Sequence, residues 1–537
     1  MSTNINNIVR PLGNLERFFQ IVHDIDYYYN VGLTIRYKIP KNVSLPTSTS
    51  IPDEIKNKIL RILYPTLEQT ILKEPSLAVS FANLHTSKPL FVRLLEIDLN
   101  RIVRFVIVND DHDIEQLLEE EHTTKFNVED NSIPLWRIVV GIKRDFNIKK
   151  ETTNWNLIIS IIWHHAIGDG KSALVFYSSF NESLLENLNK NHSLQDSFNE
   201  LKSNITLPQQ STIPFCKPLE KCVNIKFPFL FLVKEVFRDF VLPKFLKRKL
   251  LKGYWLGDIP TYSLSKNITK ILLYSITVEE FKSLLSQSRQ HNTTITSIFN
   301  ISLLFSAYHH LILASNKDDN ISKDAKKLAP FDTIKLDTCI NLRPYSTPEL
   351  PWTQSGIYVS DQFLIYKYPK PNNTSDNDKD SYPELDFWKM SREFREQLIN
   401  RGISDSIEYL GITKLILNDR KKFENMLHKK IDGEIMGREN SVMISNIGKF
   451  PKILSNLEGN ISDNEWTIDD MIFSQSSVNF SSGITISIIS YEDKLTFSLA
   501  YQINTISHEK VVRFGEGIVK CLKFVAKNEN VTLQDLI

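Results

Sequence analysis

The sequence predicts an α+β protein made of two similar-sized halves with mixed sheets. The chain has 537 residues, which is too long for one ordinary hydrophobic core and favours two domains or a pseudo-duplicated fold. Strand patterns and helix patterns follow one another without a regular βαβ alternation, so a mixed sheet is favoured over a doubly wound parallel one. A long polar stretch, residues 189–220, is rich in Asn, Ser, Gln and Pro and is expected to connect the halves.

Apolar spacing predicts the elements of the first half. In the first expected helix, Leu12, Leu15, Phe19 and Val22 recur at helical intervals. The predicted helices are 10–23, 52–72 and 171–188. The strands are short runs of β-forming residues. They are expected at 31–39, 89–97, 101–108, 134–142 and 155–167, with 89–97 and 101–108 paired to each other.

The second half repeats this mixture. Residues 293–313 read as a long apolar helix that opens with Thr capping candidates. The other predicted helices are 278–289, 385–402 and 507–526. Strands are expected at 268–277, 332–342, 355–366, 484–490 and 495–501, with a further segment at Trp466–Phe473. Residues 368–384 have the composition of a solvated loop. The predicted division is 1–210 for the first domain, 211–260 for a crossover and 261–537 for the second domain.

Composition excludes several classes of function. With 64 basic and 63 acidic residues the net charge is +1, which gives no global electrostatic case for nucleic-acid binding. The four cysteines are irregularly spaced, so neither a disulfide framework nor a zinc ribbon is expected and a reducing compartment is favoured. The polar N-terminus lacks a signal-peptide pattern, and no run of 18 apolar residues predicts a spanning helix. The expected location is therefore cytoplasmic.

One short stretch, IIWHHAIGDGKS at 161–172, carries the clearest chemical signal. An apolar strand ends in His164 and His165, and Asp169 and Gly170 follow. Taken singly, each histidine suits a core position, and Asp169 suits the N-cap of the next helix. A metal site is the weakest interpretation, because only two ligands are visible. A histidine with a near-neutral pKa can also act as a general base, and Gly170 would leave space for a substrate.

Several segments together resemble a known enzyme group. HHAIGDG resembles the HHxxxDG signature of the CoA-dependent acyltransferase superfamily, which includes chloramphenicol acetyltransferase, plant BAHD enzymes and peptide-synthetase condensation domains. The chain is most similar to the fungal alcohol O-acetyltransferases, whereas the DFGWG segment of the BAHD enzymes is missing. The similar segments occur in the same order along nearly the whole chain. They are PLGNLERFF (11–19), PLWRIVV (134–140), DTCINLRPY (337–345), FWKMSREFREQL (387–398), SNIG (445–448) and FSQS (473–476).

This resemblance implies a fold and a division of roles. It implies two chloramphenicol-acetyltransferase-like domains, each an α/β two-layer sandwich, with an active-site channel at their interface. His165 would be the general base, with His164 in support and Gly170 in a steric role. Asp169 would be structural and would pair with Arg343, although Arg343 also suits an ordinary surface position. Two further residues, Asn446 and Gln475, are candidates either for substrate or CoA binding or for structural hydrogen bonding.

The implied reaction is transfer of acetyl from acetyl-CoA, as co-substrate, to a hydrophobic alcohol, without a covalent enzyme intermediate and without a metal. The same motif suits two alternatives: an N-acetyltransferase of a sphingoid-like or other lipophilic amine, and a noncatalytic binding protein. The enzyme is expected to act as a monomer. The basic, aromatic stretch 227–255 suits either an interfacial segment or a core helix pair, so peripheral contact with endoplasmic reticulum or lipid droplets is one expectation. The C-terminal helix is amphipathic and is expected to pack on the domain.

Overall fold

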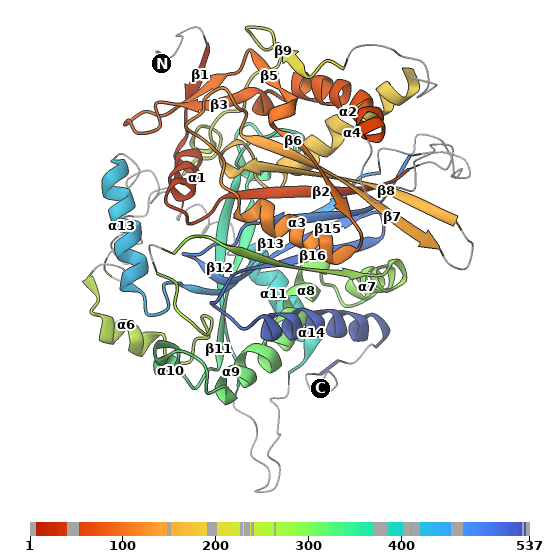
Figure 1. Ribbon diagram of the computed structural model, residues 1–537. Coiled ribbons are helices and arrows are strands. Elements are labelled where there is room, and N and C mark those ends of the chain that lie inside the picture. Colours follow the sequence, from red (N-terminus) through yellow and green to blue (C-terminus); the bar gives the residue numbers. More distant parts are fainter. Residues whose placement is uncertain are drawn as a thin grey trace, which may run out of the picture.

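Two mixed sheets dominate the computed structural model of the chain (Figure 1). The structure describes residues 7–39, 53–147, 152–190, 201–225, 229, 233, 237, 241–262, 265–369, 385–400, 410, 419–452, 466–528 and 531–532. Most of the predicted loop 368–384 and the predicted helix end at Gly402 lie outside the described residues.

The first sheet has five strands in the order β14-β2-β8-β7-β6. Four of them belong to the first half of the chain: β2 (Asn30–Lys38), β6 (Val103–Val108), β7 (Trp136–Asn147) and β8 (Thr152–His164). The fifth, β14 (Thr467–Gln475), comes from the second half and pairs antiparallel with β2. Only β6 and β7 pair in parallel, so the sheet is mixed as predicted. The two halves therefore share this sheet. The domain boundaries 1–210, 211–260 and 261–537 stay a prediction.

The second sheet has six strands in the order β10-β16-β15-β13-β11-β12. The strands are β10 (Thr269–Ile276), β11 (Thr333–Asn341), β12 (Val359–Lys367), β13 (Asn440–Phe450), β15 (Ser482–Tyr491) and β16 (Lys494–Gln502). β13 pairs in parallel with both β11 and β15, and the other pairs are antiparallel. This sheet is also mixed, because β10, β11, β13 and β15 run in one direction and β12 and β16 run in the other.

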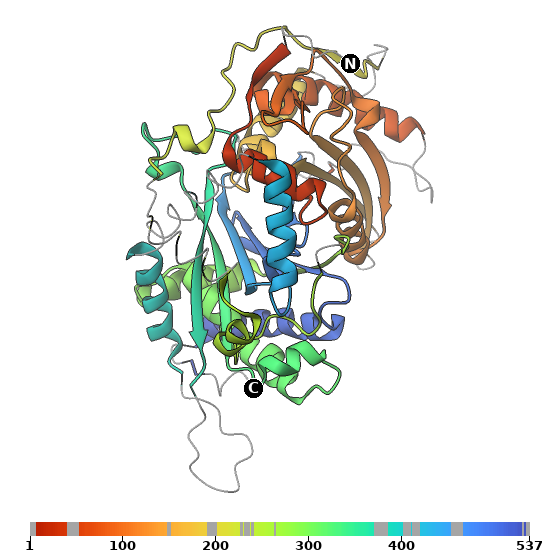
Figure 2. The same cartoon turned by 90° about the vertical axis from the view of Figure 1, so that its left-hand side faces the viewer.

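Helices cover the sheets and join the halves. Over the first sheet lie α2 (Asp53–Lys73) and α4 (Ser172–Lys190), and the second carries α7 (Val278–Gln290), α8 (Ile295–Ala307) and α14 (His508–Lys527) (Figure 1). α13 (Arg420–Gly433) runs along the side of both halves (Figure 2). Its first residue, Arg420, bonds Asp24 of the first half, and Lys244 of α6 (Lys244–Leu250) donates to the carbonyl of Asp432 near its end. Further α-helices in the described parts of the chain are α1 (Asn14–Asp24), α3 (Asp111–Thr123), α9 (Ala314–Lys317), α10 (Lys323–Leu328) and α11 (Phe387–Asn400).

Two large apolar cores follow from this layering. One lies between α2, α4 and the first sheet, and the other lies between the second sheet and helices α8 and α14. The apolar stripe of α14, including Val511, Phe514 and Ile518, is buried in the second core, as expected for a helix that packs on its domain. Ile295–Lys317 is long and apolar enough to cross a membrane, but 78% of its most apolar window is buried. It is a core helix.

The structure corrects two predictions of local structure and adds elements that were not predicted. Strands 89–97 and 101–108 do not pair: β4 (Leu90–Arg93) pairs with β1 (Ile8–Pro11) and β3 (Val79–Ala82), whereas β6 pairs with β7. A 3-10 turn at Leu99–Arg101 redirects the chain between them, after the short strand β5 (Glu96–Asp98), which pairs with β9 (Asn204–Thr206). The first helix begins at Asn14, because residues 8–11 form an edge strand. Helices α3 and α13 and strand β13 were not predicted.

Candidate active site

The motif lies where β8 ends and α4 begins. β8 ends at His164, and His165–Ile167 form one 3-10 turn. The Ala166 N–H donates to His164 Nδ1 at 3.0 Å, and the Trp163 indole N–H donates to the Gly168 carbonyl at 2.9 Å. These local bonds fix the sharp change of direction that separates His165 from the strand. The turn is therefore held by the side chains of the two residues that precede it, Trp163 and His164.

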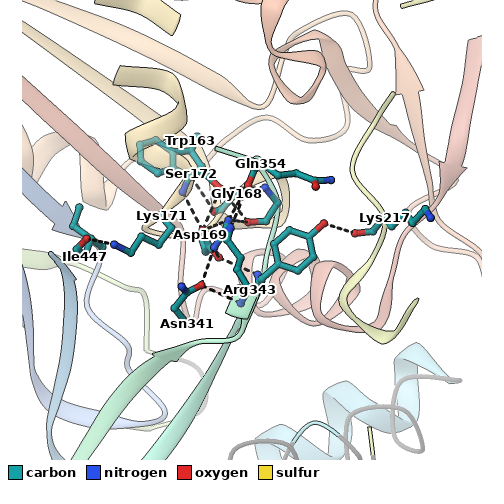
Figure 3. Close-up of polar contacts among 12 residues, drawn as sticks. Trp163, Gly168, Asp169, Lys171, Ser172, Lys217, Asn341, Arg343, Gln354 and Ile447 are labelled. Carbon is teal, nitrogen blue, oxygen red and sulfur yellow. Dashed lines mark hydrogen bonds and ion pairs between the residues drawn. The ribbon is translucent and has the colours of Figure 1, made fainter. Parts of the chain in front are cut away.

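Asp169 and Arg343 form a buried ion pair across the two halves of the chain (Figure 3). The guanidinium donates twice, from Nη1 to Asp169 Oδ2 at 2.8 Å and from Nη2 to Oδ1 at 3.0 Å. The side chains are 4% and 1% exposed, respectively. Arg343 also donates to the carbonyls of Gln354 and Gly356 and to the side chain of Asn341. The predicted pairing is present, and Arg343 is not a surface residue.

The same carboxylate also caps α4. Asp169 Oδ1 accepts from the Ser172 backbone N–H at 3.0 Å and from its hydroxyl at 3.1 Å, and Oδ2 accepts from the Tyr358 N–H at 2.9 Å. The capping and ion-pair interpretations therefore both hold, because the two oxygens are shared. Burial alone would raise the pKa of Asp169, but Arg343 and the Tyr358 N–H together lower it below its usual value. Asp169 is a fixed anion that ties the motif turn to residues 354–358.

His165 has the environment of a neutral base. Its ring stacks on Phe19 of α1, with centroids 3.9 Å apart and planes 5° apart, and Tyr28 lies 5.5 Å away. Burial lowers the pKa of His165 to about 4, while its own backbone carbonyl and the charge of Asp169 act in the opposite direction. Nδ1 has no hydrogen-bond partner outside its own residue among the described parts of the chain. The imidazole is therefore uncharged at neutral pH and can accept a proton.

His165 lies on the wall of a cavity of about 220 Å³ between the two sheets. Most of the wall is apolar, and it comes from both halves of the chain. The apolar side chains from the first half are Leu15, Phe18, Phe19, Tyr28 and Val31, and those from the second are Val359, Leu410, Met443, Phe473, Val478 and Phe480. The cavity suits a small or slender apolar ligand that reaches the imidazole.

His164 points away from this cavity into the first core. Its ring lies 4.5 Å from His23 and 5.2 Å from Phe81, and burial holds its pKa well below the usual range. Because its Nδ1 accepts from Ala166, it supports the turn rather than the reaction centre. This placement agrees with the supporting role that the motif predicts.

The space expected beside Gly170 is occupied by protein. A Cβ on Gly170 would lie 2.5 Å from Ile447 Cγ2 and 3.0 Å from Phe473 Cζ. The steric requirement for glycine is real, but it comes from the close approach of β13 and β14 rather than from an open path for substrate. The prediction of open space at this position is therefore wrong, although Gly170 does line the cavity.

The two remaining candidates differ in position. Gln475 lines the cavity, where it accepts from the Tyr28 hydroxyl at 3.0 Å and donates to Ser487. Asn446 lies outside the cavity lining, and it donates to Thr296 and accepts from the Gly448 N–H. Its neighbour Ser445 faces the cavity instead, because side chains alternate along β13. Structural hydrogen bonding accounts for Asn446, whereas Gln475 serves both as a bond partner and as cavity wall.

Comparison with known proteins places this geometry in a family. A family model described as alcohol acetyltransferase matches residues 11–525, which include the motif, Arg343 and the whole cavity wall. The chain belongs to the alcohol acetyltransferase family.

Relatives of this alcohol acetyltransferase family member are distant in sequence. A probable alcohol acetyltransferase of Aspergillus fumigatus is 26% identical over 181 residues, which are 32% of this chain and 36% of that protein. The match thus spans about a third of that relative. An uncharacterized protein of Schizosaccharomyces pombe is 23% identical over 478 residues, covering 87% of this chain and 90% of that one.

Solved structures show the fold of the family member more clearly. The trichothecene 15-O-acetyltransferase of Fusarium sporotrichioides superposes with a TM-score of 0.62 at 11% identity, over 96% of this chain and 94% of that one. The first condensation domain of the CDA synthetase gives 0.51 at 10% identity, over 98% and 99%. The predicted α+β fold with two chloramphenicol-acetyltransferase-like domains is confirmed. The family implies an acyl-CoA co-substrate and an alcohol acceptor.

Sequence reasoning missed two groups of charged residues in this alcohol acetyltransferase family member. Asp337 and Asp361 line the cavity from β11 and β12, and Lys171, Lys449 and Lys452 line a surface hollow of about 790 Å³ beside the start of α4. The only sequence signal was the position of two of the lysines directly after the motif segments, in DGKS and SNIGKF. Among the described residues no group of three or more His, Cys, Asp or Glu side chains is placed to hold a metal ion.

Proposed function

We propose that the protein is an acetyl-CoA-dependent O-acetyltransferase that forms acetate esters of hydrophobic alcohols, with His165 as the general base. One observation supports this proposal: the neutral imidazole of His165 lines a mostly apolar cavity that lies between the two sheets of an acyltransferase fold. The mostly apolar wall favours a hydrophobic acceptor. His165 is unprotonated at neutral pH and therefore ready to accept a proton.

The reaction needs only one proton carrier. His165 takes the proton of the acceptor hydroxyl as the oxygen attacks the thioester carbonyl. The new O–C bond forms, the tetrahedral intermediate collapses with loss of the C–S bond, and His165 returns the proton to the CoA thiolate. The developing oxyanion needs a hydrogen-bond donor. The hydroxyl of Ser445, which lines the cavity, is our candidate for that donor.

The surface hollow is the proposed site of the CoA nucleotide. Lys171, Lys449 and Lys452 would bind its phosphates, and Trp352, 53% exposed, offers a ring face to the adenine. Glu492 and Asp493 line the same hollow, where they form ion pairs with Lys452 and Lys449, respectively. A bound phosphate would replace these carboxylates as the partner of the two lysines. Lys171 donates to the carbonyl of Ile447, which places its charge between the hollow and Gly170.

A thiol-release assay with acetyl-CoA, run across short alcohols, sterols and long-chain amines, tests the proposal. General-base catalysis typically contributes ~10²–10⁴ in rate, so His165→Ala should lose that factor in kcat. His85→Ala, which changes a histidine whose side chain is 66% exposed, is the matched control and should keep wild-type activity. Lys449→Glu should raise KM for acetyl-CoA far more than KM for the alcohol. If the wild type releases no thiol with any acceptor, the protein is a binding protein and the proposal fails.

We also propose that the segment around α6 contacts a membrane surface. Five apolar side chains at four-residue spacing, Phe229, Val233, Phe237, Val241 and Phe245, are 68%, 48%, 53%, 57% and 67% exposed. The basic residues of 244–252 adjoin them, as in segments that lie in the interface of anionic membranes. Sedimentation with vesicles that contain phosphatidylserine tests this. The double variant Phe237→Glu and Phe245→Glu should abolish binding to these vesicles. If the double variant sediments with the vesicles as the wild type does, the proposed membrane contact is refuted.

A further inference from the structure

One wall of the cavity is acidic. Asp337 and Cys339 lie two residues apart on β11, so they share a face of the sheet. Asp361 of β12 is the cross-strand partner of Cys339, and Met443 of β13 is that of Asp337. All four side chains line the cavity that holds His165. The second sheet therefore presents two carboxyl groups to a space that is otherwise mostly apolar.

One carboxyl oxygen of Asp337 has no hydrogen-bond partner among the described residues. The residue is 2% exposed. Its Oδ2 accepts from the amide of Asn440 and the hydroxyl of Ser481, both at 3.3 Å. Its Oδ1 is buried and has no hydrogen-bond partner, although buried polar atoms nearly always have one. Asp169, the other buried acid of the site, differs because both of its oxygens are bonded.

Burial and the closeness of the two acids set the electrostatics of this wall. Burial raises the pKa of Asp337 well above its usual value, and the nearby Asp361 raises it further; burial likewise raises the pKa of Asp361 to about 6. Burial thus disfavours the charged form of both carboxyl groups. Among the described residues that line the cavity, none is Lys or Arg, and His165 is neutral. Two further charges act on the pKa of Asp337: Lys335, which lies over the Phe363 ring, lowers it, and Glu439 raises it.

Burial makes the ionised form of Asp337 costly, and a ligand cation beside Oδ1 would lower that cost. A neutral hydroxyl would supply a hydrogen bond but would not favour the ionised carboxylate. Since the opposite side of the cavity is apolar, a ligand with a hydrocarbon part and one cationic group matches both walls. The ammonium group of an amine has this charge and three N–H donors.

We propose that the acceptor acetylated at this site is an amino alcohol, whose hydroxyl reaches His165 while its ammonium group binds Asp337 Oδ1. The inference rests on the proposed acetyltransferase function and narrows its substrate class. The chemistry is unchanged: the hydroxyl oxygen forms the ester bond, the C–S bond breaks, and the hydroxyl proton passes through His165 to the CoA thiolate. The nitrogen stays protonated and is not acetylated, because an ammonium has no lone pair with which to attack.

The test compares three series of acceptors matched in chain length: primary alcohols, diols, and amino alcohols with graded spacing between hydroxyl and amine. Full-length enzyme and acetyl-CoA are used, with thiol release for rate and mass spectrometry for product. At the best spacing, kcat/KM for the amino alcohol should exceed that of both neutral partners by about tenfold or more, as expected for a charge-assisted hydrogen bond. Asp337→Asn should abolish that ratio.

Controls separate recognition from folding. Asp470→Asn changes a carboxyl of β14 that is buried outside the cavity and bonds Lys494 and Thr496. It should lower the rates with all acceptors in parallel and keep their ratio. A protonated N,N-dimethylalkylamine, which forms no stable amide, should compete with neutral alcohols in the wild type and lose at least tenfold in inhibition constant with Asp337→Asn.

Three outcomes overturn this inference without touching the proposed function: equal kcat/KM for amino alcohols and primary alcohols, diols as good as amino alcohols, or an N-acetyl product. The first shows that the acidic wall does not recognise the acceptor, the second that charge is not recognised, and the third that the nitrogen rather than the oxygen reaches His165. Absence of thiol release with every acceptor refutes the acetyltransferase function itself.

Discussion

A double-mutant cycle on Asp169 and Arg343 tests how the site is held together. Asp169→Asn turns one acceptor oxygen into an NH₂ donor that faces the donors of Arg343 or Tyr358, and it leaves a guanidinium buried without its anion. Arg343→Met leaves the carboxylate with its bonds from Ser172 and Tyr358 only. Breaking one partner of a buried pair costs about 3–5 kcal/mol, so each single variant should lose that much free energy of unfolding.

The double variant removes both charges together. It should therefore be destabilised by about 3 kcal/mol less than the sum of the single variants, which is the upper end of measured coupling energies. Urea unfolding followed by tryptophan fluorescence measures all four proteins. The control cycle uses Glu509→Gln and Arg513→Met, an ion pair of 2.6 Å whose side chains are 72% and 63% exposed. Its coupling should be about 0.5 kcal/mol or less. Additive losses at Asp169 and Arg343 would refute the reasoning.

Three further predictions follow from the same site. Gly170→Ala should lower both the unfolding free energy and kcat, because its Cβ meets Ile447 at 2.5 Å, whereas Gly433→Ala, with no atom within 4 Å, should lower neither. The acid limb of kcat/KM should fall near the pKa of His165, about 4, and a limb near 6.5 would show a solvated imidazole. Lowering the pH from 7.5 to 5.5 should cost about 1.4 kcal/mol of unfolding free energy for each buried histidine with a depressed pKa, because the unfolded chain binds the proton first. Acids whose pKa is raised in the folded protein, such as Asp361, offset part of this loss. Calorimetry over a series of pH values measures the total change. These histidines are His23, His122, His164 and His165.

Local pattern predicted most elements of this fold but not their partners. Residues 134–142 and 155–167 were expected as strands and form β7 and β8. The pattern at 89–97 and 101–108 was equally apolar, yet these segments pair elsewhere, because the turn at Leu99–Arg101 separates them. The segment at Trp466–Phe473 gave no sign that it joins the first sheet. Pairing depends on tertiary contacts that no single segment encodes.

The residues of the candidate site were likewise predicted only in part from the sequence. The motif and its resemblance pointed to His165, Asp169 and Arg343, which the structure brings together although 174 positions separate the last two. Asp337 was not predicted as a site residue, because only the packing of the sheet shows that its face of β11 lines the cavity. The space beside Gly170 was misjudged for a related reason, since Ile447 and Phe473 reach it from distant parts of the chain.

The double variant of Asp169 and Arg343 also distinguishes the contribution of the ion pair to stability from its effect on the geometry of the site. A buried ion pair is a poor source of stability compared with apolar packing, but its bonds have fixed directions. Here those directions join the turn after His165 to residues 354–358, since Asp169 accepts from Tyr358 while Arg343 donates to Gly356. Asp169→Asn with Arg343→Met should therefore recover much of the lost stability and still show a kcat well below that of the wild type. If thiol release recovers together with stability, the pair serves only to neutralise its own charges, and the position of His165 is set by Phe19 and the turn alone.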